Sequence, residues 1–122
     1  MNAHAGIIVA HDSTRALVEE IREILVDVAK SKQTITYSDL AHRVKSRRIK
    51  PNDQDLTNAL DAISLEEESR GRGMLSAVVV SKRDGLPGYG FFHLGRRLGR
   101  QIPDRNIFWL WEFDAVCASY SE

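Results

Sequence analysis

Five basic side chains fall close together in the middle of the chain, and uncharged polar side chains follow them directly. The cations are Arg43, Lys45, Arg47, Arg48 and Lys50, and the polar residues are Asn52, Gln54, Thr57 and Asn58. Lys and Arg neutralise phosphates, whereas Asn and Gln can pair with the edge of an adenine. This spacing predicts a nucleic-acid contact; an ordinary solvated turn is the alternative interpretation.

Acidic side chains share the predicted helix that carries these polar residues. They are Asp53, Asp55, Asp61, Glu66, Glu67 and Glu68. Because like charges repel, this helix should repel a duplex unless its acids point away from it. The whole chain carries 17 Lys and Arg against 17 Asp and Glu, so its formal net charge is zero. Any attraction to nucleic acid must therefore come from local clustering.

A glycine-rich segment at residues 82–90 is the second candidate contact. Its candidate DNA-binding residues are Lys82, Arg83 and Tyr89. The Asp-Gly and Pro-Gly pairs inside it are typical of hairpin turns, since glycine accepts a positive φ. Tyr89 could lie against a sugar or a base, or it could cover the hairpin. The segment lacks the Gly-Lys-Ser/Thr ending of a phosphate-binding loop, so we do not expect it to cradle a phosphate.

Residues that could perform catalysis or bind a metal are not grouped in the sequence. The histidines, His4, His11, His42 and His93, fall in different predicted elements without metal-ligand spacing. No Gly-x-Ser-x-Gly motif provides a nucleophile. The single cysteine, Cys117, cannot form an internal disulfide, so a reducing, cytoplasmic setting is the default. We expect a protein without metal, cofactor or enzymatic activity.

Apolar segments are short throughout the sequence. The apolar start, residues 6–10, has no basic residues before it and is too short for the core of a secretory signal. No apolar run approaches the roughly 18 to 20 residues that span a bilayer. At 122 residues and 43% hydrophobic, the chain suits one domain around one apolar core. We expect a cytoplasmic protein without a membrane segment.

Apolar periodicity predicts three helices in the first part of the chain. The first covers residues 13–31, where apolar residues recur at steps of three and four, and Asp12 or Ser13 can cap it. A short connecting strand follows at residues 33–37. The second helix starts at the N-cap Ser38 and is over before Pro51. The third has Asn52 or Asp53 as its cap, buries Leu56, Ala59, Leu60 and Ile63, and ends at Gly71 and Gly73.

The second part of the chain is expected to hold a hairpin, a basic link and one more element. Residues 74–82 and 91–94 are β-prone runs that flank the glycine-rich turn. Residues 96–103 form the basic, loop-like link. The segment from residue 106 to about residue 119 alternates like a strand over part of its length, but its apolar residues also fall at helical spacing. The longer persistence of the helical period favours a helix.

This order of elements resembles that of winged helix-turn-helix domains. The likeness is carried by residues 34–41, Thr-Ile-Thr-Tyr-Ser-Asp-Leu-Ala, and by the predicted hairpin of residues 75–94. A similar Thr-x-Tyr-x-x-Leu-Ala stretch opens the corresponding unit of alkyltransferase-type DNA-repair proteins, whose Pro-Cys-His-Arg signature is absent here. Residues 75–92 also resemble uncharacterised small bacterial winged-helix proteins. The resemblance implies a third helix in the DNA groove and a wing on the backbone.

Aromatic side chains near the C-terminus suggest a different kind of surface. As a helix, this segment would carry apolar residues on two sides, more than packing on its own domain needs. The candidate interface residues are Trp109, Trp111, Phe113 and Tyr120. Large exposed apolar patches usually mark partners, and winged-helix regulators often dimerise through added terminal helices. A homodimer is one interpretation, and packing of both sides inside the domain is the other.

Together these features predict an α+β fold: one winged-helix domain over residues 1–122. Its core is residues 13–95, and residues 96–120 add the basic link and the aromatic helix. The leading functional hypothesis is a small bacterial DNA-binding protein, a candidate transcriptional regulator, that uses the third helix and the wing. The alternative is a winged-helix protein-interaction module that does not bind DNA. An enzyme or ligand-sensing domain centred on the glycine-rich segment is a remote third option.

Overall fold

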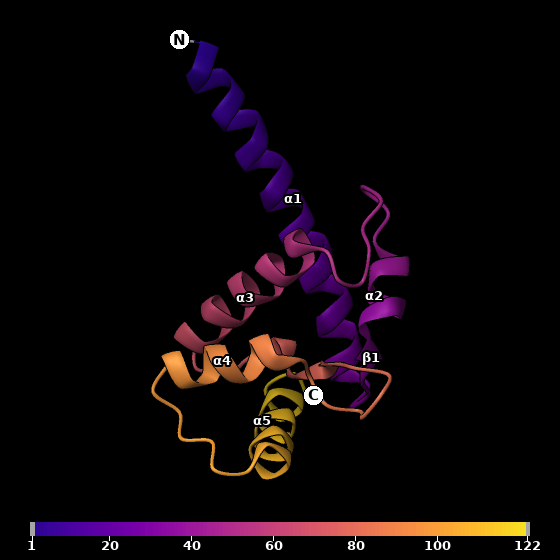
Figure 1. The fold of residues 1–122 in the computed structure, drawn as a ribbon, viewed down its shortest axis with the longest axis vertical. Coiled ribbons are helices and arrows are strands. Elements are labelled where there is room, and N and C mark those ends of the chain that lie inside the picture. The colour runs from indigo at the N-terminus through magenta and orange to yellow at the C-terminus, as the bar shows by residue number, and fades with distance from the viewer. Residues whose placement is uncertain (1, 122) are drawn as a thin grey trace.

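Helices make up most of the protein in the computed structural model, which describes the backbone of residues 2–121 and the side chains of residues 14–121 (Figure 1). In chain order the elements are α1 (Asn2–Lys30), β1 (Ile35–Thr36), α2 (Tyr37–Arg43), α3 (Gln54–Ser69), a short 3-10 helix η1 (Leu75–Val78), β2 (Val79–Val80), α4 (Tyr89–Arg97) and α5 (Arg105–Ser119). The predicted α+β class is confirmed, with five α-helices and one small sheet in the described residues.

The first helix packs through the apolar stripe that its sequence predicts. Leu17, Ile21, Leu25 and Val28 are all buried, at the three- and four-residue spacing of one helix face. This face contacts α3 and η1. The predicted cap at Asp12 or Ser13 is wrong, because α1 begins at Asn2. Residues with capping side chains also occur inside helices, so a capping residue alone does not mark a helix start.

The second and third helices begin with local hydrogen bonds. Thr36 caps α2 by accepting the backbone N–H of Asp39 at 3.1 Å, so the cap lies two residues before the predicted Ser38. Asp53 caps α3 as predicted, accepting the N–H of Asp55 at 3.5 Å. The four predicted apolar residues of α3 are buried. Just beyond α3, Gly71 has a φ of +74°, a left-handed conformation that glycine adopts without steric cost.

The small sheet is parallel and joins distant parts of the chain. Ile35 pairs with Val79, and Thr36 pairs with Val80. The predicted hairpin of residues 75–94 is therefore wrong: residues 75–78 of its first strand form η1, and its second strand lies inside α4. The Asp-Gly turn does form, with Gly85 at φ +72° and its N–H donating to the carbonyl of Ser81. That turn leads into a helix, so the described residues contain no two-stranded wing.

Neighbouring aromatic residues explain why α4 is a helix. Phe91 and Phe92 are both buried, and Leu94 and Gly95 are buried beside them. On a strand, two consecutive side chains would point to opposite faces of the hairpin. On a helix, all four residues lie on one side of the axis and can enter a single core. Burial of both phenylalanines in that core therefore favours the helix over the predicted strand.

The core lies around η1, which contacts α1, α3 and α5. Leu75, Ala77 and Val78 are fully buried there. The predicted C-terminal helix is confirmed as α5, and Asp104 caps it by accepting the N–H of Ile107 at 3.1 Å. In Figure 1, α4 lies below α3 and α5 lies below α4, and the rings of Phe91 and Phe108 join α4 to α5 with centroids 5.9 Å apart. Over the described residues, no helix is both long and apolar enough to cross a membrane.

Candidate nucleic-acid interface and adjoining pocket

The basic loop, residues 43–50, starts at the last residue of α2 and forms most of the connection to α3, and its cations face solvent. Arg43, Lys45, Arg47, Arg48 and Lys50 are all exposed. Two apolar residues between them, Val44 and Ile49, are buried and attach the connection to the core. The segment is therefore an anchored loop with exposed charges, and its backbone extends beyond α2 (Figure 1).

A carboxylate from α1 holds the start of this loop. Glu20 accepts the backbone N–H of Lys45 at 2.6 Å and the hydroxyl of Ser46 at 2.5 Å. Desolvation raises the pKa of Glu20, but hydrogen bonds from Ser46 and Lys45 outweigh it and leave the pKa below its ordinary value. This contact restrains the backbone of the loop while the side chain of Lys45 stays exposed.

Most of the loop cations have no acidic partner. Arg47 pairs with Asp55 of α3, and both side chains remain more than 40% exposed. Within residues 14–121, the side chains of Arg43, Arg48 and Lys50 form no ion pair. The loop therefore keeps a local excess of positive charge on a chain whose net charge is zero.

The acids at the C-terminal end of α3 face arginines from other elements. Glu66 pairs with Arg22 of α1, and Glu68 accepts Arg100 at 2.8 Å. Asp55 is held by Arg47 and Asp53 caps the helix. The predicted repulsion between α3 and a polyanion is therefore weakened, because these charges are compensated inside the fold.

Glu67 is the centre of a buried ionic cluster. Its side chain is 0% exposed. Its carboxylate accepts hydrogen bonds from Arg22 at 2.6 Å, from Arg72 at 2.7 and 3.0 Å, and from the hydroxyl of Tyr120. Desolvation raises the pKa of Glu67, but the hydrogen bonds from Arg72, Tyr120 and Arg22 dominate and lower it to about 2. This cluster connects α1, α3 and the end of α5, which indicates a structural role.

A second buried carboxylate organises the predicted basic link. Glu112 of α5 accepts the N–H of Met74 at 2.8 Å and Arg100 at 2.7 Å. Arg100 also holds Glu68, so it joins α5 to α3. The guanidinium of Arg100 is thus occupied by two carboxylates, and this part of the link serves the fold.

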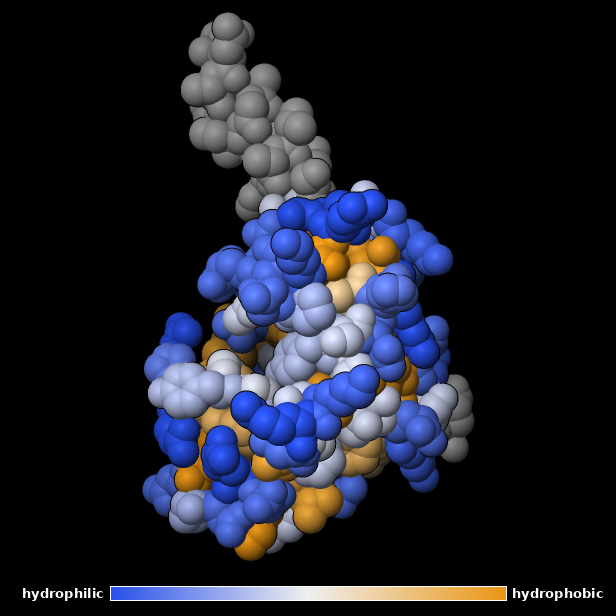
Figure 2. All heavy atoms as spheres, turned by 45° about the vertical axis from the view of Figure 1, so that its right-hand side comes forward, coloured by the Kyte–Doolittle hydropathy of each residue, from blue (hydrophilic) through white to orange (hydrophobic). Residues whose placement is uncertain are grey.

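Apart from Tyr89, the remaining predicted contact residues lie in three places. Gln54, Thr57 and Asn58 are exposed on the first turns of α3, where Gln54 donates to Asn58 at 3.0 Å. Lys82 and Arg83 are exposed on the loop of residues 81–88, as is Asn52 on the α2–α3 loop. In Figure 1 the α2–α3 loop rises above α2, and the loop of residues 81–88, which joins β2 to α4, lies below β1. Figure 2, with the right-hand side of Figure 1 turned forward, shows a largely hydrophilic face with smaller hydrophobic patches.

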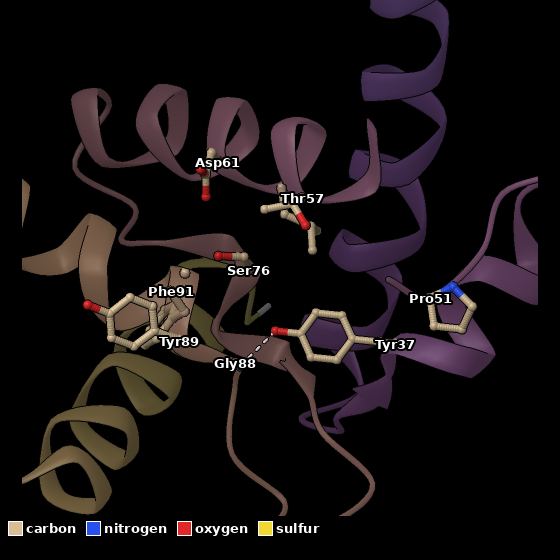
Figure 3. Close-up of a pocket in the computed structure, with 10 residues that line it drawn as sticks. Tyr37, Pro51, Thr57, Asp61, Ser76, Gly88, Tyr89 and Phe91 are labelled. Carbon is tan, nitrogen blue, oxygen red and sulfur yellow. Dashed lines mark hydrogen bonds between the residues drawn. The ribbon is translucent and has the colours of Figure 1, made fainter. Parts of the chain in front are cut away.

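A pocket of about 250 Å³ lies between α3, the start of α2 and the start of α4. Polar side chains reach it from three segments, and aromatic rings line its side (Figure 3). The residues that matter for its chemistry are Tyr37, Thr57, Asp61, Ser76, Tyr89 and Phe91. Tyr89 is 74% exposed and its ring stacks on that of His93, with centroids 5.9 Å apart. The pocket combines hydrogen-bonding groups with a flat aromatic rim.

Two of the pocket groups are available to a ligand. The hydroxyl oxygen of Tyr37 accepts the N–H of Gly88 at 2.8 Å, which leaves its proton for another acceptor. The carboxylate of Asp61 is in no ion pair with the side chains of residues 14–121. Desolvation raises the pKa of Asp61 above its ordinary value, although the charges of Arg97 and His93 act in the opposite direction. Desolvation also raises the pKa of Tyr37.

Sequence reasoning placed Asp61 among repulsive acids and missed the pocket. The four-residue spacing of Thr57 and Asp61 puts both on one face of α3, which is a signal that the sequence does contain. The contribution of Tyr37 has no such signal, because Gly88, its partner, is 51 residues away. The pocket depends on long-range packing.

The aromatic residues of α5 divide between the core and the surface. Trp109, Phe113 and Tyr120 are partly buried against the core, and the indole N–H of Trp109 donates to the carbonyl of Ala77 at 2.8 Å. The outer side of α5 carries Ile107 at 49%, Leu110 at 50% and Trp111 at 73% exposure. Of the predicted interface residues, Trp111 alone is classed as exposed.

Over the part of the chain that the structure describes, no three His, Cys, Asp or Glu residues are grouped so that they could hold a metal ion. The features that could serve a function are the basic loop, the polar start of α3, the pocket beside them and the outer side of α5. Known proteins offer no closer guide: the chain matches no family model, and no curated protein or solved structure was found to resemble it.

Proposed function

We propose that the protein binds nucleic acid through the basic loop between α2 and α3 and the first turns of α3. The observation that carries this proposal is the exposure of Arg43, Arg48 and Lys50 without acidic partners among the described side chains. Exposed cations on an anchored loop are suited to phosphate contact, because neutralised phosphates release their counterions.

The start of α3 supplies groups that can reach beyond the phosphates. Gln54, Thr57 and Asn58 are exposed beside the loop, and amide side chains can donate to and accept from base edges. Farther along α3, Glu66 and Glu68 are compensated by Arg22 and Arg100, whereas Asp61 forms no ion pair among the described side chains. The proposal therefore retains the third helix of the sequence hypothesis. It replaces the wing with the loop of residues 81–88, whose Lys82 and Arg83 are additional phosphate contacts.

The test is fluorescence anisotropy with a labelled random-sequence duplex across a salt series. A plot of log affinity against log salt concentration has a negative slope, and each phosphate contact adds about 0.9 to the magnitude of that slope. Replacing both Arg43 and Arg48 by Ala should reduce the magnitude of that slope by about 2 and weaken binding at low salt. Lys30→Ala, which removes an exposed cation from the end of α1, is the control and should change neither quantity.

Absence of binding at low salt would refute the proposal. An Arg43→Ala/Arg48→Ala double variant that binds duplex as well as the parent protein would refute the assignment of the loop. Both outcomes are interpretable only if the variants unfold at the same temperature as the parent, and thermal melting checks this.

A second candidate function, protein interaction, is favoured by the outer side of α5. Ile107, Leu110 and Trp111 are all about half exposed or more, at helical spacing. Such a patch is suited to association, including a homodimer. Sedimentation across a concentration series tests it: association that weakens in Trp111→Ala supports the interface, and a monomer at every concentration contradicts it.

A further inference from the structure

The pocket beside α3 offers one hydrogen-bond acceptor and one donor that the fold does not use. Asp61 contributes a carboxylate from α3, and Tyr37 contributes a hydroxyl proton from the start of α2. Figure 3 shows both side chains directed at the space between α3 and α4. A ligand that matches both groups must carry a hydrogen-bond donor for Asp61 and an acceptor for Tyr37.

The pocket also favours a flat, partly apolar ligand. Its lining includes the rings of Tyr37, Tyr89 and Phe91, and its volume is about 250 Å³. Drug-sized ligands usually occupy larger pockets, of roughly 300 to 1,000 Å³, so a single small heterocycle fits this space better. Tyr89 at the rim is 74% exposed, and exposed aromatic rings of this kind stack on bases.

We propose that this pocket holds the unpaired Watson–Crick edge of a nucleobase, with Asp61 accepting an N–H of the base and Tyr37 donating to the neighbouring acceptor. Every nucleobase has a donor next to an acceptor on that edge. In a duplex these groups are already paired, so the pocket selects single-stranded nucleic acid or free nucleotides. This inference rests on the proposed function and names the form of nucleic acid that the site prefers.

Cations lie on the segments that border the pocket. Pro51 lines one side and directly follows Lys50 of the basic loop. Gly88 lines another side and ends the loop that carries Lys82 and Arg83. A strand whose base occupies the pocket would therefore have basic segments on both sides of it.

Removing the carboxylate of Asp61 tests the proposal, because a loss of affinity and a gain of affinity have different causes. Asp61→Ala and Asp39→Ala each delete one carboxylate, and Asp39 lies exposed on α2 outside the pocket. If charge alone mattered, both variants would bind a polyanion slightly more tightly than the parent. If Asp61 holds a base, Asp61→Ala should bind a labelled single strand about tenfold more weakly, because a hydrogen bond to a charged group is lost. Its affinity for the matched duplex should not fall.

Tyr37→Phe tests the donor, and it should weaken single-strand binding without weakening duplex binding. Competition by an unlabelled nucleoside monophosphate then separates the two sources of the base. If the mononucleotide displaces the strand from the parent protein, free nucleotides are ligands. If it does not, the base must come as part of a strand. Either result fits the pocket chemistry when Asp61→Ala shows the selective loss.

The inference is overturned if Asp61→Ala binds the single strand as well as Asp39→Ala does, while thermal melting shows that the Asp61→Ala variant is folded. That outcome leaves the proposed function intact, provided that duplex binding still depends on Arg43 and Arg48. If the parent protein binds neither duplex nor single strand at low salt, the proposed function itself is refuted.

Discussion

The carboxylate of Glu67 accepts a hydrogen bond from Arg22 at 2.6 Å across 45 residues of chain, and this contact joins the end of α3 to the middle of α1. Arg72 and Tyr120 bind the same carboxylate. Because Glu67 is fully buried, its charge is tolerated only with these partners in place. The proposed nucleic-acid surface depends on this cluster indirectly, since it neutralises the distal end of α3.

Replacing Glu67 should destabilise the protein more than replacing its neighbour. Glu67→Gln removes the buried charge that Arg22 and Arg72 bind. Because both arginines are partly exposed and Arg22 keeps its pair with Glu66, we expect a loss of about 3 kcal/mol in the free energy of unfolding, at the low end for a broken buried pair. Glu66→Gln, in a more exposed pair, should cost less than about 1 kcal/mol. Urea denaturation measures both. Equal losses would mean that the Glu67 cluster contributes no more than a surface pair.

Stability should fall as the protein is acidified below the ordinary pKa of glutamate. The pKa of Glu67 is lowered from 4.5 to about 2 in the folded protein. Folding therefore favours the ionised form, so its contribution is fully present above about pH 4.5 and disappears as the pH falls toward 2. The melting temperature between pH 7 and 2 should show this loss. The Glu67→Gln variant should lose less stability than the parent over the same range, and identical pH profiles would contradict the assignment.

Two glycines with similar backbone angles should respond differently to alanine. Gly73 has a φ of +87°, and an added Cβ would lie 3.1 Å from Val116 Cγ2 and 3.2 Å from Glu112 Oε2. Gly71 has a φ of +74° with nothing within 4 Å of such a Cβ. Gly71→Ala should cost about 1 to 2 kcal/mol from left-handed strain alone. Gly73→Ala should cost more, because Val116 or Glu112 must move. Denaturation of the two variants compares the costs, and a larger loss for Gly71→Ala would contradict this packing.

Substitution of adjacent phenylalanines distinguishes the helix α4 from the hairpin strand that the sequence predicts. Phe91 and Phe92 are both buried in α4, so Phe91→Ala and Phe92→Ala should each cost about 3 to 5 kcal/mol. On a hairpin strand, the two side chains would point to opposite faces and one would be exposed. A near-zero cost for either variant in thermal or urea unfolding would support the strand. Tyr89→Ala, at an exposed residue, is the control and should cost little.

Features that depend on local sequence are predictable. The buried stripe of α1 and the four apolar residues of α3 follow from helical periodicity. Asp53 as the cap of α3 and the stop near Gly71 follow from hydrogen bonds and φ angles that involve only neighbouring residues. The helical period also identifies α5, although its start at Arg105 needed the structure.

Features that depend on distant partners required the tertiary structure. The run at residues 75–80 is apolar and β-prone in isolation, yet only Val79 and Val80 form a strand, because their partner β1 is two residues long. Glu67 looks like any surface acid until Arg22 and Tyr120 surround it. The sequence by itself determined α1, α2, α3 and α5 and the cluster of cations at residues 43–50, but not α4. Only packing decided which acids are neutralised and that Asp61 and Tyr37 share a pocket, because those interactions join segments that the chain keeps far apart.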